Sequence, residues 1–153
     1  MTAASDTARD ETRTLRRIRA VVALLATGTA AGGLVELAML RHWVGVQVLP
    51  WVVLTLVGVV GLLTARGGPA RLARIVGVVG LLGGAFGVWR HVAANLALGP
   101  RLADYAGTWD TLPLLERWWL AATGSVGAAP ALAPGLLALA GGLLIVAVLD
   151  RRD

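Results

Sequence analysis

The chain contains no cysteine and no lysine. Without cysteine there is no disulfide, no thiolate ligand for a metal ion and no catalytic thiol. The fourteen basic residues are all arginine, and they flank apolar segments instead of forming a patch interleaved with aromatic residues. The net charge of +5 is therefore not interpreted as a sign of nucleic-acid binding.

Apolar residues are abundant instead, at 57% of the chain, with a mean hydropathy of +0.74. A membrane core about 30 Å thick requires about 20 apolar residues per helix. Four segments approach that length: residues 20–40, 48–65, 75–97 and 133–149. The sequence therefore predicts an all-α protein whose single domain, residues 15–153, is a bundle of four transmembrane helices. Residues 1–14 are polar and charged, which favours a disordered tail on the cytoplasmic side.

The arginines predict the orientation of the bundle. Ten of them precede the first segment, join the second to the third or follow the fourth: Arg9, Arg13, Arg16, Arg17, Arg19, Arg66, Arg71, Arg74, Arg151 and Arg152. The other connections hold four, and an excess of arginine marks the cytoplasmic side. Both termini are thus expected in the cytoplasm. The first segment is longer than a signal-peptide core, and three more follow, so we expect it to be retained as a span.

The only long connection, residues 98–129, is predicted to face the outside. Within it, Thr111 suits a helix cap, Pro113 suits a first turn and Gly124 suits a stop, so a short helix is expected between them. Its Trp118 and Trp119 suit a helix lying in the membrane interface. Three further tryptophans are expected at the same level as interfacial anchors: Trp43, Trp51 and Trp89. The alternative interpretation is a surface on which a partner docks.

Glycines follow helical spacing, which predicts where helices pack. Four lie at intervals of three, four and three in the third segment: Gly77, Gly80, Gly84 and Gly87. In lipid, helices associate by close packing, which small residues permit. Gly28 and Gly32 form a GxxxG pair in the first segment and are expected to pack in the same way.

Polar residues continue these small faces. His91 and Asn95 follow Gly87 at four-residue steps, and Glu36 follows Gly32 by four. Glu36 and His91 each lie sixteen residues from the start of their segments, a rise of about 24 Å, so equal depth is expected. Because ionisable groups in membrane helices usually have partners, we predict that Glu36 pairs with His91. His42 and Asn95 would complete a cluster near the outer face.

Three short stretches resemble a group of small bacterial four-helix membrane proteins with no assigned activity. They are "ELAMLRH", with Glu36 and His42, "GVWRHVAAN", with His91 and Asn95, and "APALAPG", Ala129 to Gly135. Members usually carry an acidic residue soon after the asparagine, where this chain has Leu96, Ala97 and Leu98, which weakens a metal-site interpretation. Their usual aromatic and basic ending is replaced by "VLDRRD". The resemblance implies a multi-pass protein of the bacterial inner membrane and no particular reaction.

Three functions remain open from the residues. The first is an accessory or scaffold subunit that contacts a membrane-protein partner or forms a homo-oligomer. The second is a site for a metal ion, haem or quinone at the outer face, since imidazole and carboxylate suit zinc, copper or iron. The third is a proton-coupled transporter that uses Glu36. Enzymatic chemistry is not favoured, because no spacing resembles a catalytic triad or nucleophile elbow. No cofactor is specified.

Overall fold

The computed structural model describes residues 2–127 and 132–151. Met1, residues 128–131 and the last two residues lie outside this description, and with them the first part of the Ala129–Gly135 motif. Within the described ranges the regular elements are all helical. The α-helices are α1 (Thr2–Met39), α2 (Val48–Ala65), α3 (Ala70–Leu98), α4 (Leu114–Thr123) and α5 (Leu132–Val146). Four single-turn 3₁₀ helices join them: η1 (Gly45–Gln47), η2 (Gly99–Arg101), η3 (Ala103–Tyr105) and η4 (Trp109–Thr111).

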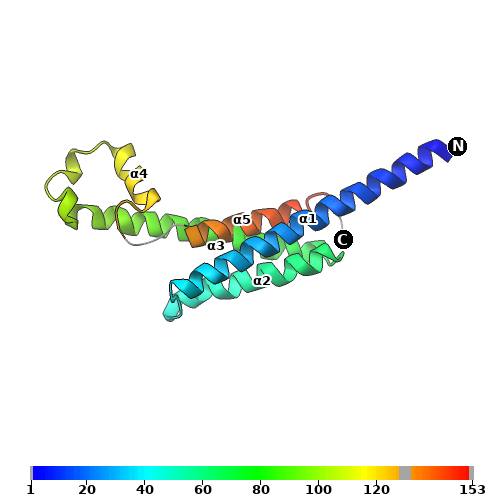
Figure 1. The fold of residues 1–153 in the computed structure, drawn as a ribbon, viewed down its shortest axis with the longest axis horizontal. Coiled ribbons are helices and arrows are strands. Elements are labelled where there is room, and N and C mark those ends of the chain that lie inside the picture. The colour runs from blue at the N-terminus through cyan, green and yellow to red at the C-terminus, as the bar shows by residue number, and fades with distance from the viewer. Residues whose placement is uncertain (1, 128–131, 152–153) are drawn as a thin grey trace.

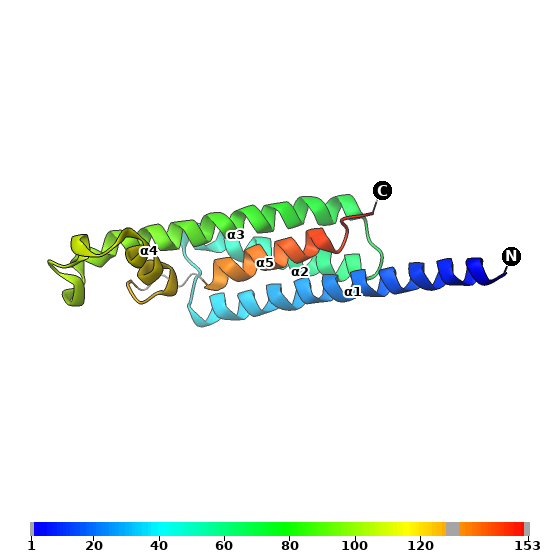
Figure 2. The same cartoon turned by 90° about the horizontal axis from the view of Figure 1, so that it is seen from above.

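Helices α1, α2, α3 and α5 form a bundle in which each runs antiparallel to the next (Figure 1). Helix α1 packs against α2 and α5, and α3 packs against the same two helices. Helices α1 and α3 therefore lie diagonally opposite each other, with α5 and α2 between them (Figure 2). We call the end at the α1–α2 turn the His42 end and the other the Asp150 end.

Three helical segments of the described chain are long and apolar enough to cross a membrane: Arg9–Met39, Gly45–Ala65 and Ala70–Arg101. Helix α5 has 15 residues, which gives about 22 Å of rise against the roughly 30 Å of a hydrocarbon core. After Val146 the chain tightens into turns, in which Val148 N–H donates to Ile145 O at 3.1 Å. The fourth segment is thus helical but shorter than the predicted range 133–149.

The bounds of the other helices test the sequence expectations one by one. Helix α2 occupies the predicted range, and α3 begins five residues earlier than expected, directly after Pro69. Residues 2–14, for which the sequence favours a disordered tail, are the first part of α1, which begins at Thr2. No glycine or proline occurs between Thr2 and Thr27, so nothing in the sequence interrupts that helix.

Two helices extend beyond the bundle, at opposite ends (Figure 1). Helix α1 projects past the Asp150 end, and its residues 9–18 are exposed. Arginines at positions 9, 13 and 16 line a shallow hollow on one face of this projection. Helix α3 projects past the His42 end and carries the segment 99–127, which includes α4 and which we call the cap.

The glycine seam of α3 is the tightest contact in the bundle. A Cβ atom at Gly84 would lie 2.3 Å from the backbone nitrogen of Ala138, and one at Gly77 would lie 2.9 Å from the carbonyl oxygen of Gly141. Gly80 faces Gly141 in the same way, and Gly87 faces Pro134. The predicted seam on α3 therefore packs against α5.

The other predicted packing pair behaves differently. Cβ atoms at Gly28 and Gly32 would have no neighbour within 4 Å, and both residues are exposed. The packed glycine of α1 is instead Gly33, which contacts Leu54 and Leu136. The expectation that Gly28 and Gly32 pack inside this chain is not met.

Alanines, valines and several leucines fill the interior, while many other large apolar side chains lie on the outer surface. The buried cluster contains Ala26, Ala30, Leu54, Val57, Leu137, Ala140 and Leu144 among others. Leu24, Val52, Leu82 and Leu139, one from each bundle helix, are 49%, 51%, 63% and 54% exposed. Apolar surface this extensive is expected where the solvent is lipid, because water-exposed apolar patches in soluble proteins are small.

Candidate functional site at the His42 end

The turn between α1 and α2 places His42 at the end of the bundle. Arg41 adopts a left-handed backbone conformation, φ 53°, which reverses the chain after α1. The backbone N–H of His42 donates to Leu37 O at 3.0 Å, and the indole N–H of Trp51 donates to His42 O at 2.6 Å. Trp43 stacks on Trp51 with ring centroids 4.9 Å apart. The position of His42 is therefore set by contacts from both helices.

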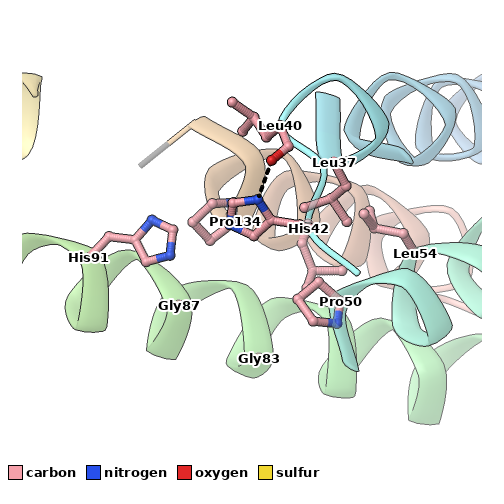
Figure 3. A pocket seen from close by; sticks show the side chains of 10 residues that line it. Leu37, Leu40, His42, Pro50, Leu54, Gly83, Gly87, His91 and Pro134 are labelled. Carbon is pink, nitrogen blue, oxygen red and sulfur yellow. Dashed lines mark hydrogen bonds between the residues drawn. The ribbon is translucent and has the colours of Figure 1, made fainter. Parts of the chain in front are cut away.

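The imidazole of His42 is oriented by the turn as well. Its Nδ1 atom lies 3.3 Å from the carbonyl oxygen of Leu40, which can only accept a hydrogen bond (Figure 3). Nδ1 is thus the donor. In the neutral ring, Nε2 then carries the lone pair that accepts a hydrogen bond from another group.

His91 lies one turn beyond Gly87 on α3 and lines the same pocket as His42 (Figure 3). The two histidines come from opposite sides of the bundle, one from the α1–α2 turn and one from the diagonal helix. Both are half-buried. The sequence predicted that these two imidazoles share a site, and the structure brings them to one cavity.

The cavity between them is small and mainly apolar, with a volume of about 80 Å³. Its inner wall is formed by leucines that are at most 4% exposed: Leu37, Leu54 and Leu137. Pro50, Pro134 and the glycines 83 and 87 complete the walls, together with Leu40. Polarity therefore rises from the leucines in the bundle toward the histidines at its end.

Glu36 does not join this pocket. It is half-buried near the end of α1, and its carboxylate makes no hydrogen bond or ion pair among the residues that the structure describes. The predicted pairing with His91 requires α1 and α3 to be neighbours, whereas α2 and α5 separate them. The structure therefore does not assemble the four-residue cluster.

Asn95 has a different role from the predicted one. It is 2% exposed, and its side-chain N–H donates to Ala121 O at 3.0 Å. A Cβ atom at Gly127 would lie 2.2 Å from the Asn95 Oδ1 atom, so the chain after α4 passes directly over this amide. Asn95 thus attaches the cap to α3 and does not line the pocket.

A second cap contact was missed from the sequence. Trp109 is 4% exposed and packs on Gly99, where an added Cβ atom would lie 2.5 Å from the indole ring. Tyr105 meets the same indole edge-on, with centroids 5.7 Å apart. The sequence signal for this contact was Gly99, a glycine that follows an apolar helix and precedes a loop with aromatic residues.

The other tryptophans that were predicted as anchors are exposed to different degrees. Trp89 is 53% exposed, with the Arg90 guanidinium 6.0 Å from its ring. Trp118 and Trp119 are 42% and 68% exposed on α4, which ends at Gly124 in the left-handed conformation, φ 73°. The short helix of the cap is therefore present, but its N-cap is Pro113 and not the predicted Thr111, which belongs to η4.

Electrostatic contacts gather at the opposite, Asp150 end. The guanidinium of Arg19 donates two hydrogen bonds to the Asp150 carboxylate, one of them at 3.1 Å. This pairing holds the pKa of Asp150 below its usual value, since the hydrogen bonds favour the charged form. Arg74 donates to Val148 O at 3.2 Å and Arg151 to Gly67 O at 3.3 Å. These contacts tie the chain that follows α5 to α1, to α3 and to the α2–α3 turn.

The described residues contain no group of three histidine, aspartate or glutamate side chains arranged to hold a metal ion. The pocket supplies two imidazoles, and a catalytic zinc site uses three protein ligands.

Comparison of the chain with protein-family models, with curated proteins and with solved structures gives no match.

Proposed function

We propose that this protein is an integral membrane protein that acts as an accessory or scaffold subunit. It crosses the membrane four times and has both termini in the cytoplasm. The observation that carries the proposal is the pair of opposite projections, α1 past one end of the bundle and α3 past the other (Figure 1). Helix α1 has 38 residues and a length of about 57 Å, more than the roughly 40–45 Å of a bilayer with its headgroups. In this proposal the bundle holds two surfaces, the projection of α1 and the projection of α3 with the cap, outside the hydrocarbon core.

The orientation is supported by the distribution of arginine. The Asp150 end and the projection of α1 carry most of the arginines, including Arg13, Arg66, Arg71 and Arg151. An excess of arginine favours the cytoplasmic side. In this arrangement α5 is the fourth span, and its short length is accommodated by local thinning of the bilayer and by its packing between the longer helices.

The cap then lies at the outer surface. Helix α3 has 29 residues, a rise of about 43 Å, which matches a bilayer including its headgroups. Its last two turns carry α4, whose exposed Leu114, Leu115, Trp118 and Trp119 suit the headgroup region. Of these four side chains, Leu115, at 82% exposure, and Trp119 are the most available to a partner or to lipid.

The alternative functions have weaker support. An apolar cavity of about 150 Å³ binds a single benzene ring, so the 80 Å³ pocket is far too small for haem. A transporter that uses Glu36 would favour a carboxylate near the membrane midplane. Glu36 lies within four residues of the end of α1, at the His42 end of the bundle.

Site-specific photo-crosslinking in cells tests the scaffold function. A benzophenone amino acid replaces Thr14 on the α1 projection or Trp119 on the cap, and Val79, an exposed residue of the α3 span, serves as the control position. We expect an adduct of one defined protein mass from a projection and none from Val79. No protein adduct at either projection, or the same adducts from Val79, would contradict the proposal. An adduct consisting only of a second copy would replace it with self-association.

A further inference from the structure

We propose that Arg13, Arg16 and Arg17, on the projection of α1, bind the phosphate of an anionic phospholipid such as phosphatidylglycerol (Figure 1). We call these three residues the arginine face. The inference rests on the membrane-spanning part of the proposed function and does not require a protein partner. It assigns a lipid ligand to the part of the projection nearest the bundle.

The three arginines lie on one side of α1. Arg16 and Arg17 follow Arg13 by three and four residues, which places them one turn away on the same side of the helix. All three are exposed, and Arg13 and Arg16 line the shallow hollow together with Arg9 and Thr12. Guanidinium groups at this spacing can share one phosphate, because each offers several N–H donors in a planar fork.

The arginine face differs from other arginines of the Asp150 end in having no acceptor within the described chain. Arg19 is paired with Asp150, and Arg74 donates to the carbonyl oxygen of Val148. The three arginines of the face make no hydrogen bond or ion pair among the residues that the structure describes. Residues 12–19 contain no acidic residue. Since like charges one turn apart repel each other, an anion bound between these arginines would relieve that repulsion.

The arginine face lies at the depth of lipid phosphates. Arg19 marks the end of the bundle through its pairing with Asp150. At about 1.5 Å per residue, Arg17, Arg16 and Arg13 lie about 3, 4.5 and 9 Å beyond Arg19 along α1. The headgroup layer of one leaflet is about 5–8 Å thick. Long arginine side chains therefore reach the phosphates from these backbone positions.

The opposite side of the same helical turns favours lipid over an acidic protein segment as the source of the anion. Leu15 and Ile18 are 48% and 53% exposed, and their positions on the helix face away from Arg13. Arginine on one face and large apolar residues on the other is typical of helices at a membrane interface. At this depth the apolar side chains contact lipid, whereas next to a soluble acidic protein they would remain in water.

The lipid preference of the full chain tests the proposal. The chain in a neutral detergent is titrated with dioleoylphosphatidylglycerol or dioleoylphosphatidylcholine, and bound lipid is measured by native mass spectrometry. The two lipids have the same acyl chains, so a difference in affinity reports the headgroup. We expect phosphatidylglycerol to bind more tightly. Equal affinity of the two lipids for the wild-type chain would overturn the proposal.

The double variant Arg13→Gln/Arg16→Gln should lose most of the preference for phosphatidylglycerol. Each arginine near an anionic lipid surface contributes about a fivefold factor in affinity. Glutamine is a good helix former, so far-UV circular dichroism should stay unchanged. An unchanged preference in this variant, with the helix content intact, would show that the arginine face does not hold the lipid.

Arg90→Gln/Arg101→Gln is the matched control variant. Both arginines are exposed, and they lie on α3 and η2, away from the Asp150 end. This variant removes the same net charge and should keep the preference for phosphatidylglycerol. An equal loss in the two double variants would overturn the proposal, because net charge and not the arginine face would then attract the lipid.

Two competitors separate lipid from other anions. Neither inorganic phosphate nor a glutamate-rich peptide should displace phosphatidylglycerol from the wild-type chain. Displacement by either one would show that a free anion or an acidic protein segment occupies the arginine face instead. Carbonate extraction of cell membranes distinguishes the two proposals: a chain that stays in the membrane but binds both lipids equally contradicts only the lipid site, whereas a chain that is extracted contradicts the membrane-spanning bundle as well.

Discussion

Gly84 allows the packing between α3 and α5 to be tested with a single methyl group. In Gly84→Ala the new Cβ atom would lie 2.3 Å from the nitrogen and 2.7 Å from the Cα atom of Ala138, and 2.6 Å from the oxygen of Pro134. Ordinary contacts begin at 3.4 Å, so α5 must move away by about 1 Å. Because these are backbone atoms, no side-chain rotation relieves the overlap.

The expected change in the free energy of unfolding of Gly84→Ala is the balance of two opposing effects. Overpacking of a close contact costs about 1–3 kcal/mol, and a clash with three backbone atoms belongs at the upper end of that range. Alanine is better than glycine in a helix by about 1 kcal/mol. We therefore expect Gly84→Ala to lower the free energy of unfolding by about 2 kcal/mol.

A substitution at the neighbouring Gly83 separates the cost of the backbone clash from the gain in helix preference. Gly83→Ala adds the same methyl group where nothing lies within 4 Å, so only the helix preference should act, a gain of up to about 1 kcal/mol. Both free energies are measured by reversible unfolding in mixed micelles with increasing dodecyl sulfate, followed by far-UV circular dichroism. If Gly84→Ala is as stable as Gly83→Ala, the close approach of α3 and α5 is not present in the folded protein.

Three other substitutions address the cap, the Asp150 end and the isolated carboxylate. Asn95→Leu removes the donor to the Ala121 carbonyl, which should cost about 1–3 kcal/mol and increase protease cleavage within residues 99–127 while the bundle stays helical; unchanged cleavage would show that the amide does not hold the cap. Asp150→Asn should lower the melting temperature slightly at neutral pH. Because pairing with Arg19 lowers the pKa of Asp150, the stabilisation is present above 3.8 and is lost as the pH falls through the lowered value, so wild type and variant should converge in acid; a difference that persists there would refute the assignment. Glu36→Gln should change the free energy of unfolding by less than about 0.5 kcal/mol, because the described residues offer the carboxylate no partner. A large loss would instead support its predicted pairing.

Much of the helical pattern could be predicted because it depends on local properties. The bounds of α2 and the seam from Gly77 to Gly87 follow from apolar length and from the spacing of small residues on one helix face. The helical start of α1 at Thr2 was missed because polar composition was weighed more heavily than the lack of any helix-breaking residue. The end of α5 at Val146 was also missed, since Ala147 to Leu149 are as apolar as the helix itself.

The candidate site was predicted in part. His42 and His91 were both identified, and both line the pocket. Glu36 and Asn95 were grouped with them by helical spacing alone. Spacing determines on which face of its own helix a residue lies, but it does not determine which neighbouring helix that face contacts. The apolar character of the cavity was not predicted, because its leucines are typical of any membrane helix.

The sequence by itself determined that the protein is helical, that it has long apolar segments, and which face of α3 packs closely. It predicted four membrane spans, whereas three helical segments of the described chain are long and apolar enough to cross a membrane. These properties arise from hydrophobicity and periodicity within single segments. Only the tertiary structure decided that α1 and α3 are diagonal, that Asn95 holds the cap and that two imidazoles share a cavity. The neighbours of a helix depend on how four helices fit together at once, and no single segment encodes that choice.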